Sequence, residues 1–160
     1  MMMKTLLNAA EIAARVPHHG TMCLLHTLHE SSDAHVLCST TSHQAADNPL
    51  RSASGLLSCN AIEYAAQAMA LHGAMTSPAS NAPQGGRLAS VRSVKLHVPR
   101  LDTVAGPLFV HAERLAGDGG QAMYQFTLRD ERQSLLVQGR ATVLLMPSPE
   151  PSPEPSSTPS

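Results

Sequence analysis

Glu63 and Gln67 are the residues of this sequence whose types and spacing most clearly suggest chemistry. They lie four residues apart within Gly55–Gly73, so on a helix both side chains project from the same side. The segment that holds them, Ala61–Ala74, is apolar on nearly every face, and a helix of that kind is normally buried. Because burial raises the pKa of a carboxyl group, Glu63 is a candidate acid or base in a site that excludes water.

Both residues also have structural interpretations. Asn60 and Glu63 fit the spacing of a capping box, in which Asn60 would cap the helix and Glu63 would reach back to the backbone. Gln67 either orients Glu63 or holds a water molecule, or it is simply a buried amide with its hydrogen bonds satisfied. The residues alone leave these alternatives open.

Other reactive side chains give weaker signals. The histidines are scattered, with no HxH or HExxH pairing, so we expect no metal site. Cys59 precedes the apolar helix, and a small buried cysteine is the favoured interpretation over a nucleophile. Ser58 has no G-x-S-x-G setting, so the sequence does not support a serine hydrolase.

Composition excludes several classes of protein. The 160 residues carry a net charge of −1 and only four aromatic side chains, which argues against a nucleic-acid-binding protein. Three cysteines without a CxxC motif suggest a reducing compartment. No apolar run reaches transmembrane length, and the N-terminus lacks the apolar core of a signal peptide. We therefore expect a cytoplasmic protein that does not bind membranes.

The chain divides into elements that must position Glu63 and Gln67. Hydrophobic periodicity and turn residues predict a short helix capped by Asn8, two strands, the apolar helix and four further strands. Their predicted ranges are Leu6–Arg15, Met22–His29, His35–Thr41, Ser58–Met75, Leu88–Val98, Pro107–Leu115, Gln121–Arg129 and Ser134–Met146. Residues 147–160 are almost entirely Pro, Ser and Glu, and we expect a disordered tail there.

This order predicts an α+β fold in residues 1–146. The strands after the apolar helix follow one another closely and so should be antiparallel. Val94, Leu96 and Val98 alternate with polar residues, as do Tyr124 and Phe126, which predicts half-buried strands. One apolar helix and one long sheet bury each other best when the sheet wraps around the helix.

Four stretches carry a resemblance to a known family. They are Val16-Pro-His-His-Gly-Thr-Met-Cys-Leu-Leu25, Asp47-Asn-Pro-Leu-Arg51, Ile62-Glu63-Tyr-Ala-Ala-Gln67-Ala and Leu88-Ala-Ser-Val-Arg-Ser-Val-Lys-Leu-His-Val-Pro99. They resemble the "L-P-H-R-x-P-F-L-L" strand, the segment before the helix, the "E-x-x-A-Q" helix and the "F-x-x-P-V" strand of the hot-dog acyl-carrier-protein dehydratases. In particular, the chain is similar to the 3-hydroxyacyl-ACP dehydratases of aryl polyene and related type II fatty-acid or polyketide systems, which have the hot-dog fold.

The resemblance implies loss of water from a 3-hydroxyacyl thioester to give a 2-enoyl thioester. In that family a histidine removes the C2 proton, and a helical carboxylate, matched here by Glu63, helps to protonate the leaving hydroxyl. Related enzymes carry the histidine in a "G-H-F-P" motif, but Asn48 and Pro49 occupy that position here. The nearest upstream histidine is His43, which we take as the candidate base, with Gln67 in support. The alternative for His43 is a solvent-exposed loop residue.

The resemblance also suggests how substrate and partners bind. We take His18, Asn48, Pro49 and Gly55 as candidate substrate-binding residues; His18 alternatively serves a turn and a subunit contact. The acyl group would arrive on the phosphopantetheine arm of an acyl carrier protein, without a separate cofactor. The chain would form a homodimer, or a heterodimer with a related hot-dog subunit. Two other functions remain open: a non-catalytic partner subunit of a heteromeric dehydratase, and an acyl-thioesterase.

Overall fold

The structure is a computed structural model that describes residues 3–18, 20–76, 86–118 and 120–145. It contains two α-helices, three short 3₁₀ turns and six strands within these residues. In chain order they are α1 (Ala9–Ala13), η1 (Gly20–Met22), β1 (Thr27–Ser31), β2 (His35–Thr40), η2 (Ser42–Gln44), η3 (Ser58–Asn60), α2 (Ala61–Thr76), β3 (Gly86–Leu96), β4 (Leu108–Gly117), β5 (Gln121–Arg129) and β6 (Leu135–Leu145).

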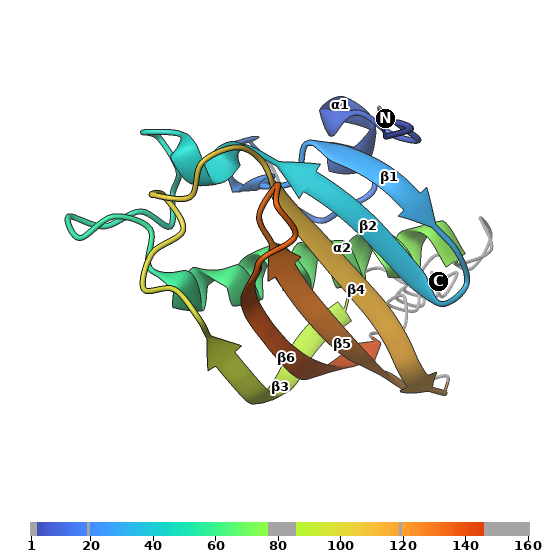
Figure 1. Cartoon of the computed structure of the whole chain (residues 1–160). Coiled ribbons are helices and arrows are strands. Elements are labelled where there is room, and N and C mark those ends of the chain that lie inside the picture. Colours follow the sequence, from blue (N-terminus) through green and yellow to red (C-terminus); the bar gives the residue numbers. More distant parts are fainter. Residues whose placement is uncertain (1–2, 19, 77–85, 119, 146–160) are drawn as a thin grey trace, which may run out of the picture.

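The strands form one antiparallel sheet that curves around α2 (Figure 1). Their order across the sheet is β1-β2-β4-β5-β6-β3, so β3 lies at one edge beside β6, the last strand of the chain. Helix α2 packs against the middle strands β2, β4 and β5. The predicted α+β architecture, with a long central helix wrapped by an antiparallel sheet, is confirmed.

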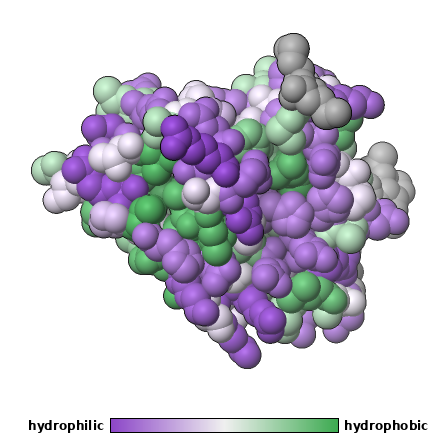
Figure 2. Space-filling view, in the orientation of Figure 1, coloured by the Kyte–Doolittle hydropathy of each residue, from purple (hydrophilic) through white to green (hydrophobic). Residues whose placement is uncertain are grey.

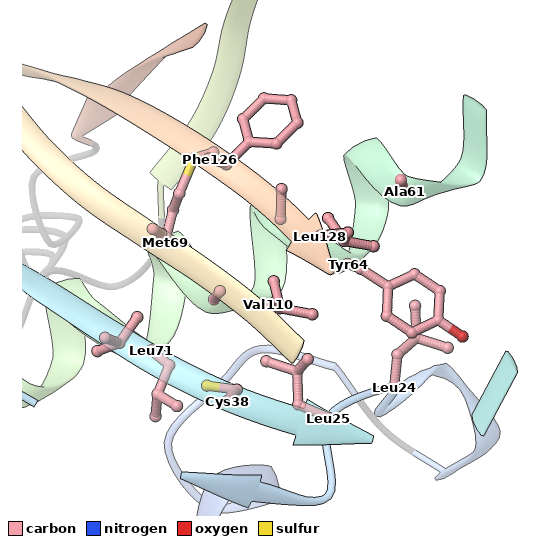
Figure 3. Packing of buried hydrophobic residues seen from close by; sticks show 14 of the residues in the cluster. Leu24, Leu25, Cys38, Ala61, Tyr64, Met69, Leu71, Val110, Phe126 and Leu128 are labelled. Atoms are coloured by element: carbon pink, nitrogen blue, oxygen red, sulfur yellow. The ribbon is translucent and has the colours of Figure 1, made fainter. Parts of the chain in front are cut away.

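The core lies between α2 and the inner face of the sheet (Figure 3). Tyr124, Phe126 and Leu128 on β5 point inward and alternate with more exposed residues, as the sequence predicts. On the helix, Ala65 and Ala68 are fully buried, and their small side chains let the sheet approach closely. Figure 2 shows polar and apolar residues interspersed over the face seen in Figure 1, whereas the buried apolar residues form one continuous core.

The N-terminal part of the chain confirms one sequence prediction, the Asn8 helix cap, and contradicts another, the start of the first strand. Asn8 caps α1, and a reciprocal hydrogen-bond pair with Glu11 completes a capping box. The strand expected from Met22 begins only at Thr27, so that boundary is wrong. The reason is tertiary: the side chain of Gln67 on α2 binds the backbone of Met22 and Leu24, which keeps this stretch out of the sheet.

Strand β3 is more exposed than its sequence pattern suggests. Leu88 and Leu96 are exposed, and Val91 and Val94 are only partly buried, so the expected half-buried alternation is wrong. The pairing of β3 with β6 shifts register twice, and Ser93 has a positive φ of 53°. These irregularities break the two-residue period that would place alternate side chains on one face. An edge strand with exposed leucines is therefore available for a contact.

His72 links the end of α2 to the β1–β2 turn. Its side chain is fully buried, and Nε2 donates to the carbonyl oxygens of Ser32 (3.0 Å) and Asp33 (3.1 Å). Since Nε2 carries the proton, Nδ1 accepts from the Tyr124 hydroxyl at 2.7 Å. Burial lowers the pKa of His72 below its usual 6.5, so the folded protein holds this imidazole neutral.

We expect this buried histidine to make the protein sensitive to acid. Because the pKa of His72 is lowered only in the folded state, the unfolded chain binds more protons as the pH falls below about 6.5. The free energy of unfolding should then fall by up to about 1.4 kcal/mol per pH unit for this one group. Urea denaturation at pH 7.5 and 5.5 measures the loss, and a His72→Gln variant should show a smaller one. An equal pH dependence in both proteins would rule out His72 as a source.

One sequence prediction falls outside the described residues: the tail expected over residues 147–160. Within the part of the chain that the structure describes, neither helix has the length and apolar character needed to cross a membrane.

Candidate active site

Glu63 and His18 form an acid/base pair at the start of α2. Glu63 lies in the first turn of the helix, and its Oε1 is 3.0 Å from Nε2 of His18, which precedes η1. The side chains are 33% and 25% exposed, so the pair is half-buried and still accessible. A carboxylate and an imidazole within hydrogen-bond distance of each other are the kind of pair that general acid/base catalysis uses.

Gln67 lies one turn along α2 and fixes the carboxylate. Its Nε2 donates to Glu63 Oε1 (3.3 Å) and to the carbonyl oxygen of Met22 (2.6 Å), and its Oε1 accepts from the N–H of Leu24 (2.9 Å). Gln67 is 1% exposed, so these bonds are shielded from water. Both sequence interpretations of Gln67 therefore apply, because the amide is satisfied and also orients Glu63.

The capping interpretation of Glu63 does not describe the structure. Helix α2 follows directly from η3, so Asn60 lies inside a continuous helical segment. The Asn60 side chain donates to the carbonyl oxygen of Leu57 at 3.1 Å, and Glu63 Oε1 faces His18 and Gln67. The carboxylate is thus directed at other side chains.

The structure does not bring His43 to the carboxylate. His43 lies in η2, fully buried, with Nε2 donating to the carbonyl oxygen of Val104 at 3.1 Å. Burial lowers the pKa of His43. None of the hydrogen bonds among the described residues joins His43 to Glu63 or Gln67. His18, which the sequence suggested as a substrate-binding or turn residue, is the histidine that contacts Glu63.

The other predicted substrate-binding residues, Asn48, Pro49 and Gly55, differ in burial and in backbone conformation. Asn48 is 7% exposed, and its Nδ2 donates to the Tyr64 hydroxyl (3.1 Å) and to the carbonyl oxygen of Ser42 (2.9 Å). Pro49 is exposed. Gly55 has φ of 93°, so its backbone favours glycine, and a Cβ there would require the Arg100 side chain to shift, because it would lie 2.5 Å from Nη2. Asn48 and Gly55 thus have structural roles within this chain.

Two arginines beside Gly55 converge on one carboxylate. Arg100 binds Asp102 through Nε (3.1 Å) and Nη2 (2.5 Å), and Arg51 Nη2 lies 3.7 Å from the same carboxylate. The hydrogen bonds from Arg100 hold the pKa of Asp102 well below its usual range. Asp102 also accepts from the N–H of Leu56 at 2.9 Å, so the cluster pins the loop that leads into η3 and α2.

Nothing in the described residues resembles a metal centre, because no three His, Cys, Asp or Glu side chains gather closely enough there. The thiol of Cys59 is exposed at the start of η3, which differs from the buried cysteine that the sequence suggested. Within the described residues, the site consists of the hydrogen-bonded side chains of His18, Glu63 and Gln67.

Comparison with known proteins identifies the family and the fold of this chain. The family described as ApeP dehydratase matches residues 10–152. A solved structure of the dehydratase heterocomplex ApeI:P from Xenorhabdus doucetiae contains a chain that is 26% identical, with a TM-score of 0.72; the match covers 84% of this chain and 90% of that one.

More distant structures share the fold alone. A thioesterase from Pseudomonas aeruginosa is 13% identical with a TM-score of 0.64, over 92% of this chain and all of the other (100%). A thioesterase from Haemophilus influenzae is 12% identical with a TM-score of 0.63, over 92% and 96%. No curated protein sequence gives a significant match. The family match spans nearly the whole described chain, including His18, Glu63 and Gln67, and this hot-dog protein therefore belongs to the ApeP dehydratase family.

Proposed function

We propose that this chain dehydrates a 3-hydroxyacyl group carried on the phosphopantetheine arm of an acyl carrier protein, in the cytoplasm, during aryl polyene or related fatty-acid or polyketide synthesis. The observation that carries the proposal is the 3.0 Å contact between His18 and Glu63, supported by Gln67 on the same helix. The family match gives the reaction class, which is that of a hydro-lyase. No further cofactor is needed, because the reaction only moves protons and releases water.

The proton balance assigns a role to each member of the pair. His18, neutral, takes the proton from C2 of the acyl group, and the C3–O bond breaks as Glu63 gives its proton to the departing hydroxyl. The products are a 2-enoyl thioester and water. The proton gained from C2 then passes across the short contact from His18 to Glu63, so the pair returns to its starting state.

Stabilisation of the thioester oxygen is the second requirement of this chemistry. A helix start offers backbone N–H groups that can bind such an oxygen, and α2 begins directly after η3. The N–H groups of Ser58 and Asn60 already donate to the carbonyl oxygens of Pro99 (3.1 Å) and Leu57 (3.0 Å). We therefore assign this role to the neighbouring backbone of η3 around Cys59.

A partner subunit is part of the proposal. The exposed leucines of β3 lie at a sheet edge, and a second hot-dog subunit would cover them and continue the sheet. The matched Xenorhabdus chain belongs to a heterocomplex, which favours a related subunit over a second copy of this chain. The same observation supports the alternative function, in which this chain stabilises an active relative without catalysing the reaction.

A single set of assays separates these functions. The purified chain, alone and mixed with a related hot-dog subunit, is given a 3-hydroxyacyl carrier protein, and the acyl products are followed by mass. Enoyl product that requires this chain's own Glu63 supports the proposal. Enoyl product that survives loss of Glu63 supports a non-catalytic partner, and free acid would indicate a thioesterase.

A further inference from the structure

Tyr64 follows Glu63 on α2 and joins the helix to the loop before it. The ring is fully buried, and Figure 3 shows it beside Leu24. The hydroxyl lies 2.8 Å from Ser42 Oγ and accepts from Asn48 Nδ2 at 3.1 Å. Asn48 is itself fixed, because its Oδ1 accepts from the N–H of Leu50 at 2.9 Å. The Tyr64 hydroxyl is therefore the centre of a buried polar network.

The protons of this network have one consistent direction. Ser42 has a single hydroxyl proton, which it donates to the carbonyl oxygen of Leu24 at 2.7 Å. With that assignment Tyr64 donates to Ser42, whose Oγ also lies 3.0 Å from Thr40 Oγ1. Burial raises the pKa of Tyr64, so the phenol keeps its proton and remains a donor at neutral pH. The order of donation is Asn48 to Tyr64, Tyr64 to Ser42, and Ser42 to Leu24.

Leu24 is the point where this network meets the catalytic pair. Its carbonyl oxygen accepts from Ser42 Oγ and also from Thr40 Oγ1 of β2, and its N–H donates to Gln67, the residue that also binds Glu63. One residue upstream, Cys23 Sγ donates to the carbonyl oxygen of His18 at 3.0 Å. The N–H of Leu24 is thus tied to α2 directly, and its carbonyl oxygen is tied to α2 through Ser42 and to β2 through Thr40. The segment that carries His18 is anchored at this residue.

We propose that Tyr64 and Ser42 are positioning residues for the reaction: they fix residues 20–24 against α2 and so hold His18 at hydrogen-bond distance from Glu63. This inference rests on the dehydratase function proposed above. Small displacements of a reacting group can cost orders of magnitude in rate. Removing one hydroxyl of the network also leaves a buried partner unsatisfied, which favours movement of the segment.

Tyr64→Phe tests the proposal, with Tyr124→Phe as the matched control. Both changes remove one hydroxyl from a buried, hydrogen-bonded tyrosine, but Tyr124 binds His72 towards the other end of α2. We expect Tyr64→Phe to lower kcat about tenfold or more with KM within about twofold, and to speed hydrogen exchange in peptides covering residues 18–25. Tyr124→Phe should change neither, although both variants should lose thermal stability.

Equal kcat values in the two variants would overturn the proposal, as would unchanged exchange over residues 18–25 in Tyr64→Phe. A Tyr64→Phe/Ser42→Ala double variant should be no slower than the slower single variant, since both act through Leu24. If the unmodified protein dehydrates no substrate with any partner, the proposed function fails. The exchange comparison then still decides whether Tyr64 holds the segment.

Discussion

Replacing Glu63 by Gln should lower the rate of dehydration by about two orders of magnitude or more, as loss of an acid/base group commonly does. The glutamine would keep the size of the side chain, and its amide oxygen could still accept a hydrogen bond from His18 at the position of Oε1. It cannot release a proton to the leaving hydroxyl, however. The measurement is the initial rate of enoyl product by mass, together with the melting temperature, which should change little because Glu63 is only half-buried.

A glutamate in the sheet, away from helix α2, supplies the control. Glu113 on β4 is exposed, and Glu113→Gln makes the same chemical change far from the start of α2. This variant should retain the full rate. If Glu63→Gln were as fast as Glu113→Gln in an assembly that forms enoyl product, Glu63 would not be the acid, and this chain would be the non-catalytic partner.

His18→Asn should slow dehydration by about two orders of magnitude while leaving the protein folded, because the proton acceptor next to Glu63 is lost. His43→Asn should behave in the opposite way. His43 is fully buried and bonded to Val104, so its loss should lower the free energy of unfolding by about 1–3 kcal/mol with kcat unchanged. Rates by mass and urea denaturation of both variants make the comparison.

The reverse pattern would restore His43 as the base. A His43→Asn protein that folds normally but forms no enoyl product would mean that the proton acceptor reaches Glu63 from another subunit. In that case His18 would serve only to hold the carboxylate. The roles of the two histidines are therefore distinguished by whether each substitution changes the rate of dehydration or the free energy of unfolding.

Local sequence signals predicted most of the fold because apolar patterns and capping residues decide which segments become buried helices or strands. The all-round apolar segment around Tyr64 does become the buried helix, and the alternation through Phe126 does become an inward-facing strand. Asn8 and Glu11 satisfy each other within one turn, which a spacing rule can detect. Strand β3 fails the same rule because its register shifts and its edge position override the two-residue period.

The site was harder to predict because its contacts join distant residues. His18 reaches Glu63 across 45 positions, and Gln67 reaches Leu24 across 43, so no local pattern records either contact. The Pro17-His18 segment carried a signal through its family resemblance, but it suggested a binding role. Distance along the chain favoured His43, which lies nearer to Glu63 in sequence and is directed by Val104 to another place.

Placing the imidazole and the carboxylate on the same polypeptide has a consequence for stoichiometry. An enzyme whose two reacting groups came from different subunits would need a complete interface for every working centre. Under the proposed function each copy of this chain brings both proton-transferring groups, so every copy in a complex should contribute one working centre, in addition to any that a partner subunit supplies.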